Sequence, residues 1–325
     1  MTSMIKGLFS AKARGATLAT ALLLTSASAS TAKAATVTVS STCTFAKAVK
    51  TLNVRSNQTP CTHTGTYGTS DTVVVPTGTF NIDTGVDITR SMTIHGAGKY
   101  NAHLQATSGI SNISQYAIQV ANPSIVVKID NLSLYGDQAV IGILVNAEND
   151  TNLTDNNLEL NQVIVSSFGD SGVRNEGGRV LVQNSTIELN TGVFGGGVAN
   201  TNVINDNGTW GVGSLVVKYS SISLNSADAY GGGIYNTGKL DFRSSSLGQN
   251  YAGTDGGGIF MATTVNNASC SVSRDTPAAP QSSIDYNSSP GASIISTTIY
   301  CDMHTTTGTG NSSPYCSGNV SACPQ

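Results

Sequence analysis

Three stretches of this 325-residue chain repeat one another: STIELNTGVFGGGVAN (185–200), SSISLNSADAYGGGIYN (220–236) and SSLGQNYAGTDGGGIF (245–260). Each stretch has an aliphatic residue three positions before an asparagine, and then a run of three glycines. Two weaker copies precede them, NLSLYGDQAVIGILVN (131–146) and VIVSSFGDSGVRN (163–175). Repeats of this kind indicate a stack of similar structural units, each of which contacts its neighbours.

Written as five rows, the copies give four columns that are apolar in every row. The columns are Val127, Leu158, Val180, Leu215 and Leu240; Ile129, Leu160, Val182, Val217 and Phe242; Leu134, Val165, Ile187, Ile222 and Leu247; and Ile143, Val173, Val198, Ile234 and Ile259. The first two columns are two residues apart, so their side chains point to the same face of a strand. One such coil cannot bury its apolar side alone, whereas coils stacked about 4.8 Å apart close a continuous core. The pattern predicts an all-β fold, a right-handed parallel β-helix (solenoid).

Glycine and asparagine occupy fixed places in the repeat. The three glycine runs predict a tight corner that needs positive φ or close backbone approach; they are Gly195–Gly197, Gly231–Gly233 and Gly256–Gly258. Asn190, Asn225 and Asn250 share one coil position, and Asp137 has the same place in the first row. A stacked amide donates to one neighbour and accepts from the other, so these residues are interpreted as a structural ladder. A row of ligand-binding amides is the alternative.

The N-terminal segment has the pattern of a secretory signal peptide. Basic residues (Lys6, Lys12 and Arg14) precede a short apolar run, and Ala32-Lys33-Ala34 forms an A-x-A cleavage site. We therefore expect residues 1–34 to be removed from a secreted protein, whether extracellular, periplasmic or attached to the cell surface. No later segment has the roughly 20 apolar residues that a membrane-spanning helix needs.

The remaining chain divides by composition into three parts. Residues 35–70 predict an N-terminal cap that contains a short capping helix at 43–52, residues 71–300 predict the β-helix, and residues 301–325 predict a cysteine-rich C-terminal cap or tail. The segments 71–82 and 92–98 are expected to form the first coils.

Charge argues against nucleic acid as a partner. Residues 1–34 hold four of the 16 Lys and Arg and none of the 19 Asp and Glu, so the remaining chain has a net charge of −7. Nucleic-acid binding usually needs a basic face.

All six cysteines follow the predicted signal peptide and favour an oxidising compartment. Cys43 and Cys61 lie near the start of the exported part, and the others lie near its end: Cys270, Cys301, Cys316 and Cys323. Close C-x-x-C pairs of the kind that bind zinc do not occur, so we expect disulfides. The sequence leaves their connectivity open.

The repeats resemble those of a known family. Ile187-x-x-Asn190, Ile222-x-x-Asn225 and Leu247-x-x-Asn250, each followed by GGG and Val or Ile, resemble the FxxN and GGA[IVL] repeats of polymorphic outer-membrane proteins. The start of the exported part resembles bacterial secreted β-helix proteins of the pectin-lyase-like superfamily. The phenylalanine of the family motif is aliphatic here. The resemblance implies a β-helix with an adhesin-like role.

Long connections between rows mark a possible binding edge. They fall at 146–157, 201–213 and 261–292, leave the same corner of the coil, and carry the candidate binding residues Glu148, Asp150, Asp155, Asp206, Trp210, Arg274 and Asp275. The tryptophan is suited to stacking on a sugar ring, and the carboxylates are suited to Ca²⁺. Alternatively, the tryptophan folds back onto the coil and the acids are solvated.

Two cations share one column in adjacent coils, Lys218 and Arg243. Such a pair is unfavourable unless the two charges are shielded. An acidic polysaccharide, Asp241 or water could shield them. The leading hypothesis is a non-enzymatic, adhesin-like protein that binds an extracellular polysaccharide or cell-surface glycan. The alternative is a lyase that acts on an acidic polysaccharide, with Lys218 or Arg243 as base and Ca²⁺ as a possible cofactor. No Ser-His-Asp or Cys-His arrangement stands out, and the paired aspartates expected of a polygalacturonase-like hydrolase are absent. If the protein is an enzyme, the sequence leaves a polysaccharide lyase or a glycoside hydrolase open.

Overall fold

The computed structural model describes residues 33–110, 115–136, 140–147, 155–262, 269–273, 282–285, 287–290, 295–303, 306–307 and 316–320. The predicted repeat residue Asp137 and the tail residue Cys323 lie outside this set, as does nearly all of the predicted signal peptide. None of the helices in the described part is both long enough and apolar enough to cross a membrane.

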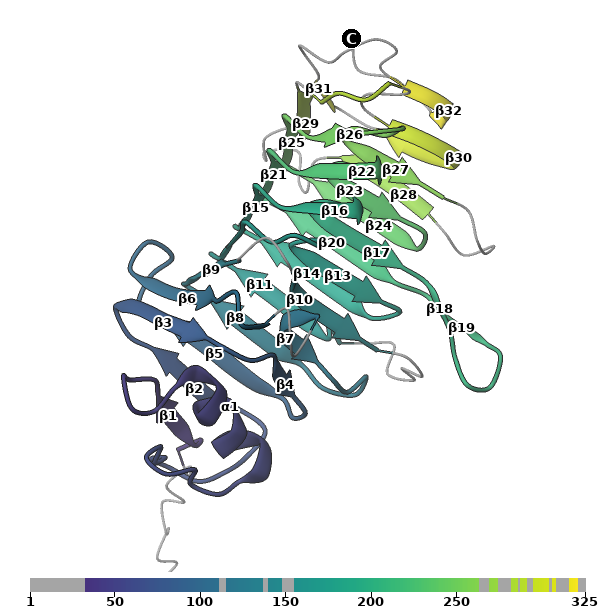
Figure 1. Ribbon diagram of the computed structural model, residues 1–325. Helices are drawn as coiled ribbons and strands as arrows, with labels where there is room; N and C mark the ends of the chain where they lie inside the picture. Colours follow the sequence, from purple (N-terminus) through teal and green to yellow (C-terminus); the bar gives the residue numbers. More distant parts are fainter. Residues whose placement is uncertain are drawn as a thin grey trace, which may run out of the picture. The chain divides into compact units, whose positions relative to one another are not determined.

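Successive coils place their strands in three parallel rows (Figure 1). Row A consists of β2 (Asp71–Val75), β5 (Met92–Gly96), β8 (Val127–Asp130), β11 (Leu158–Asn161), β14 (Arg179–Gln183), β20 (Ser214–Lys218), β24 (Lys239–Arg243) and β28 (Ser269–Ser273). Row B consists of β3 (Gly78–Ile82), β6 (Ala102–Ala106), β9 (Ser133–Tyr135), β12 (Ile164–Ser166), β15 (Thr186–Glu188), β21 (Ser221–Ser223), β25 (Ser246–Gly248), β29 (Ser282–Asp285) and β31 (Thr306–Thr307). Row C consists of β4 (Val86–Ile88), β7 (Tyr116–Val120), β10 (Ile141–Asn146), β13 (Val173–Glu176), β17 (Val198–Thr201), β23 (Ile234–Asn236) and β27 (Ile259–Met261). The fold is the predicted right-handed parallel β-helix.

Short additional strands lie between rows B and C in three coils. They are β16 (Thr191–Phe194), β22 (Ser226–Tyr230) and β26 (Tyr251–Ala252), and they pair in parallel. Near the C-terminal end, β30 (Ile295–Met303) continues two rows, because Ile295 pairs with Ile259 of row C and Cys301 pairs with Cys270 of row A. Strand β32 (Cys316–Val320) pairs with β30, so parallel pairing extends beyond residue 300.

The four predicted columns form the core. Backbone pairing aligns each column residue with its predicted neighbour in the next coil. Every column residue is buried, and the most exposed of them, Leu240, has only 2% of its surface accessible. The aliphatic pattern therefore sets both the register and the interior of the stack.

The glycine runs form a corner that excludes side chains. The first glycine of each run has positive φ: 64° at Gly195, 68° at Gly231 and 65° at Gly256. The second glycine lies against the next coil, and a Cβ built on Gly196 would be 2.2 Å from the Ser226 carbonyl oxygen. Only glycine fits both positions without strain.

In the cap, one strand and one helix precede the first coil. Strand β1 (Thr36–Thr38) pairs with β2, and helix α1 (Phe45–Val54) packs its apolar side on the core. The helix lies two residues later than predicted because the side chain of Thr44 accepts a hydrogen bond from the Lys47 N–H and caps it. A disulfide joins Cys43 to Cys61, with the two Cα atoms 4.8 Å apart. The expected disulfide at this end is confirmed.

Candidate functional site

The outward side of row A carries two ladders of side chains. In each strand the column residues point inward, and the residues between and after them point outward. The first ladder is Thr93, Lys128, Glu159, Leu181, Val216 and Asp241; the second is His95, Asp130, Asn161, Gln183, Lys218 and Arg243. These twelve residues are called the row A outer face below.

Two carboxylates lie close together on this face. Asp130 is on β8 and Glu159 on β11, and β8 pairs with β11 so that Glu159 is level with Lys128 and Asn161 is level with Asp130. The two acids are thus one strand and two residues apart. A strand spacing of about 4.8 Å and a rise of about 3.3 Å per residue place their Cα atoms roughly 8 Å apart. Both side chains are about one-quarter exposed, at 26% and 27%.

Each carboxylate is held by a different pair of neighbours. Asp130 bonds to the Nδ1 of His95, and it accepts a 3.4 Å hydrogen bond from the Asn131 side chain. Glu159 is 3.0 Å from the Lys128 ammonium and accepts a 3.2 Å bond from the Asn156 amide. The partners fix the orientation of both acids and leave them accessible from outside the coil.

This arrangement suits hydrolysis of a glycosidic bond. Such enzymes use two carboxyl groups that flank the scissile bond. Asp130 and Glu159 supply two such groups from adjacent strands on one outward face. Among the described residues there is no group of three or more His, Cys, Asp or Glu that could hold a metal ion, and the possible Ca²⁺ stays a prediction.

The two cations proposed as lyase bases do meet in the structure. Lys218 and Arg243 are level with each other in β20 and β24. The guanidinium of Arg243 forms two hydrogen bonds to Asp241, one of 2.6 Å from Nε and one from Nη2. Arginine bound in this way is a paired cation and not an available base. The anion that neutralises Arg243 is the protein's own Asp241.

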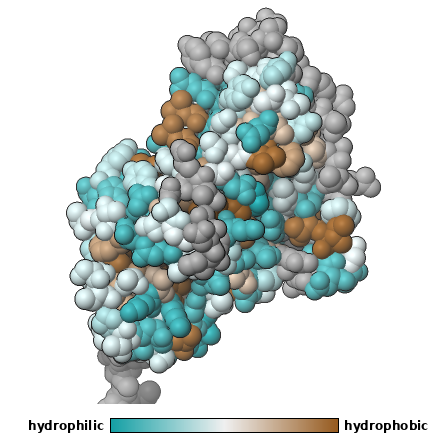
Figure 2. All heavy atoms as spheres, viewed as in Figure 1, coloured by the Kyte–Doolittle hydropathy of each residue, from teal (hydrophilic) through white to brown (hydrophobic). Residues whose placement is uncertain are grey.

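The structure places only some of the loop residues. Trp210 is on β19 (Trp210–Gly211), which pairs with β18 (Val203–Ile204) in a hairpin, and Asp206 is exposed at the tip. Trp210 is 44% exposed and Ile204, which pairs with it, is 59% exposed, so the tryptophan does not fold back onto the coil. Figure 2 shows a hydrophobic patch where Figure 1 draws this hairpin. Asp155 is exposed.

The other loop candidates cannot be assigned. Asp150, Glu148, Arg274 and Asp275 lie outside the described residues. The bases of two loops do come together, because Gly177 lies beside Ala147 and beside Val203 and Gly211 of the hairpin. The suggested binding edge therefore stays a prediction.

An aromatic cluster lies on the outside of the glycine corner. Phe194 and Tyr230 are level with each other and stack with ring centroids 6.0 Å apart, and Tyr235 and Phe260 stack at 5.7 Å. Phe194 is 42% exposed. Burial, and to a lesser extent the nearby Tyr230, raises the pKa of Tyr235. Trp210 was the aromatic residue predicted from the sequence to stack on a sugar. In the structure, rings from successive coils form a second aromatic surface.

Two further features were missed at the sequence level. Asn175, Asn200 and Asn236 form a second buried amide ladder, with Asn175 Nδ2 donating to Asn200 at 2.6 Å. The pair of carboxylates, Asp130 and Glu159, could have been found from the repeat grid. The grid places Glu159 level with Lys128, and Asp130 follows Lys128 by two residues on the same strand.

Neither a family model nor a curated protein matches the chain. Two solved structures resemble it. One is the catalytic domain of a GH87 alpha-1,3-glucanase in complex with tetrasaccharides, with a TM-score of 0.42, 12% identity, and coverage of 84% of this chain and 53% of that one. The other is the Agl-KA catalytic domain, with a TM-score of 0.35, 14% identity, and coverage of 86% of this chain and 64% of that one. The chain spans less than two thirds of either.

These comparisons correct the functional expectation drawn from the sequence. The expectation was a non-enzymatic adhesin, with a polysaccharide lyase as the alternative, whereas both similar structures are catalytic domains and one is described as an alpha-1,3-glucanase. The pairing of Arg243 with Asp241 removes one of the two proposed lyase bases independently.

Proposed function

We propose that this protein is a glycoside hydrolase that cleaves a polysaccharide bound across the row A outer face, with Asp130 and Glu159 as its two catalytic residues. The observation that carries the proposal is their position on adjacent strands, with Cα atoms roughly 8 Å apart on one outward face. Direct attack by water, with one carboxyl group as acid and the other as base, inverts the configuration at the anomeric carbon.

The neighbours of the two acids assign their roles. Asp130 acts as the general acid that protonates the leaving oxygen, and the imidazole of His95, a proton carrier bonded to it, returns the proton. Glu159, which accepts from Lys128 and Asn156, acts as the general base that removes a proton from the attacking water. The electron pair of the water oxygen forms the new bond as the glycosidic bond breaks.

The rest of the row A outer face suits a sugar chain. Beyond Glu159, the first ladder continues with the aliphatic side chains of Leu181 and Val216. Alongside them, the second ladder presents the amides of Asn161 and Gln183. Amides bond sugar hydroxyls, and aliphatic surface packs on the C–H face of a pyranose ring. This surface extends along the stack in the direction that a polymer would follow.

The test is the release of reducing ends from a panel of neutral polysaccharides. Alpha-1,3-glucan is tested first, since a similar solved structure is an alpha-1,3-glucanase. Asp130→Asn and Glu159→Gln should each lower the rate at least about 100-fold, because each removes a proton-transfer group. The matched control is Asp170→Asn, which removes a carboxylate that is ion-paired with Arg174 and is not part of the row A outer face. The control should keep wild-type activity.

Two results oppose the proposal. Wild-type protein that cleaves no polysaccharide of the panel contradicts it, and so do Asp130→Asn and Glu159→Gln variants as active as Asp170→Asn.

We further propose that the protein is exported and works outside the cytoplasm, as its leader and its repeats of the outer-membrane-protein type suggest. The Cys43–Cys61 disulfide supports this, since such bonds persist in oxidising compartments. N-terminal sequencing of the exported protein should begin at Ala35; a protein that retains the leader in the cytoplasm contradicts export.

A further inference from the structure

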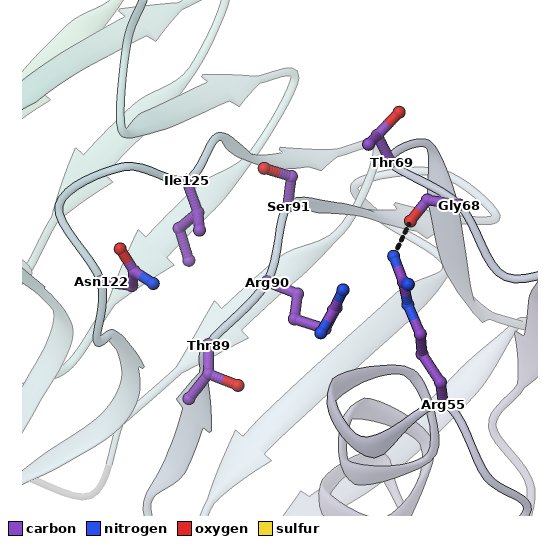
Figure 3. Close-up of a pocket in the computed structure, with 8 residues that line it drawn as sticks. All are labelled: Arg55, Gly68, Thr69, Thr89, Arg90, Ser91, Asn122 and Ile125. Atoms are coloured by element: carbon purple, nitrogen blue, oxygen red, sulfur yellow. Dashed lines mark hydrogen bonds between the residues drawn. The ribbon is translucent and has the colours of Figure 1, made fainter. Parts of the chain in front are cut away.

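A small pocket with two arginines lies where the cap meets the first coils (Figure 3). Its volume is about 300 Å³, and it is lined by the end of α1, the segment before β2, and the turns that precede β5 and β8. Its lining residues are Arg55, Gly68, Thr69, Thr89, Arg90, Ser91, Asn122 and Ile125. None of them is acidic, in a chain whose acids outnumber its cations.

Arg55 reaches the pocket because the helix ends there. It has φ of 52° and caps α1, with its N–H bonded to the Leu52 carbonyl at 3.3 Å. One guanidinium nitrogen, Nη2, donates to the Gly68 carbonyl at 3.3 Å, which anchors the side chain on the pocket wall. The other N–H groups of this guanidinium have no acceptor among the described residues.

Arg90 comes from the opposite wall, in the turn between β4 and β5. Figure 3 shows its side chain extending into the pocket toward Arg55. Within the described part of the chain it has neither a hydrogen bond nor an ion pair. The position of this turn against the helix is fixed, because Asn53 accepts from the Thr89 N–H at 3.1 Å and donates to the Asp87 carbonyl at 2.7 Å. The two cations are therefore held together by the fold.

The remaining polar groups of the lining also favour an anion. Two of its side-chain acceptors are used within the protein: Ser91 Oγ accepts from the Val126 N–H at 3.0 Å, and Asn122 Oδ1 accepts from the Ser124 N–H at 2.9 Å. The Asn122 amide N–H groups and the Thr69 hydroxyl add donors to those of the two guanidiniums. Two like charges with surplus donors and no counter-ion are costly unless an anion lies between them.

We propose that this pocket binds a tetrahedral oxyanion, sulfate or phosphate, either free or as an ester on a small sugar. A planar carboxylate is satisfied by one guanidinium fork, whereas an anion with three or four oxygens accepts from both arginines and from the amide at once. The site is independent of Asp130 and Glu159, so it stands or falls separately from the proposed hydrolysis.

Calorimetric titration of the full exported chain tests the site. The probes are inorganic sulfate, inorganic phosphate, glucose 6-sulfate and glucose 6-phosphate, with glucose as the uncharged comparison. We expect saturable binding of the anions and none of glucose. Arg90→Gln should weaken binding at least about tenfold, because it removes a charged donor fork. Tighter binding of the sugar esters than of the free ions would identify an esterified ligand, and equal binding would identify the free ion.

Two controls protect the interpretation. Arg174→Gln removes an arginine of row C that is paired with Asp170 and should bind the anions as the wild type does. Arg90→Lys keeps the charge but loses the fork and should bind with intermediate affinity. The proposal is overturned if the wild type shows no saturable anion binding, or if Arg90→Gln binds as tightly as Arg174→Gln while the thermal midpoints of both match the wild type.

Discussion

The side-chain amide of Asn190 donates a 3.0 Å hydrogen bond to Oδ1 of Asn225, and the same oxygen accepts the backbone N–H of Asn190. Asn225 makes the same two bonds to Asn250, and Asn250 to Asn287. All four side chains are buried. Each asparagine thus satisfies groups that a bend in the coil would otherwise leave without partners, which explains why the repeat keeps this residue.

Removing one member of this ladder should destabilise the fold. Asn225→Ala removes the acceptor of the buried Asn190 backbone N–H and the side-chain donor to the Ile187 carbonyl, at an expected cost of about 2–4 kcal/mol in the free energy of unfolding. Urea unfolding measures it. The control is Asn81→Ala, an outward and exposed asparagine of β3, which should change stability by less than about 0.5 kcal/mol. Equal effects would show that the ladder contributes nothing.

The glycine corner predicts a steric effect. Gly196→Ala places a Cβ 2.2 Å from the Ser226 carbonyl oxygen and should cost about 1–3 kcal/mol or more. Gly109→Ala is the matched change, since its Cβ has no neighbour closer than 3.7 Å. Thermal unfolding should separate the two variants clearly, and a Gly196→Ala protein as stable as Gly109→Ala would refute the proposed close packing of the corner.

The disulfide should stabilise the cap. It links residues 18 apart, and a loop of about this length is stabilised by roughly 3 kcal/mol in the chain-entropy account. The double variant Cys43→Ala/Cys61→Ala should therefore unfold at lower urea concentration. Reducing agent added to the wild type should have a similar effect, and it should change nothing further in the double variant if this bond alone is responsible.

Tyr116 predicts a stability change at high pH. Burial, together with a 2.6 Å hydrogen bond from its hydroxyl to Asp87, raises its pKa from 10.0 to about 12. A raised pKa means that folding favours the protonated phenol, so its contribution is complete below pH 10 and is lost as the pH approaches 12. Ultraviolet titration should show a late-ionising component near pH 12 that loses one tyrosine in Tyr116→Phe. A titration unchanged by this substitution would contradict the assignment.

The core was predictable because it depends on a periodic signal. The columns that include Ile187, Ile222 and Leu247 follow from spacing alone, and the backbone pairs these residues as expected. The first coils were also predicted, as strands β2, β3 and β5 begin at the expected segments. Register in a two-residue alternation is strongly specified when one face is buried.

The site was less predictable for physical reasons. The relation between Asp130 and Glu159 depends on register in the outward direction, where no burial pattern draws attention to it. The position of Arg55 and Arg90 in one pocket depends on where α1 ends and on the turn that Asn53 holds. Neither feature is periodic in the sequence. Arg243 was placed in the right column, but the partner that neutralises it is two residues away on its own strand.

The most direct test of the carboxylate pair is the configuration of the sugar it releases, followed by proton NMR during the first minutes of cleavage of an oligosaccharide from the substrate identified in the panel. The proposed direct attack of water, with Glu159 as base and Asp130 as acid, predicts that the first product has the opposite anomeric configuration to the bond that was cleaved, and that Glu159→Gln forms none of it. A first product that retains the configuration, or an inverted product formed at the wild-type rate by Glu159→Gln, would contradict the account.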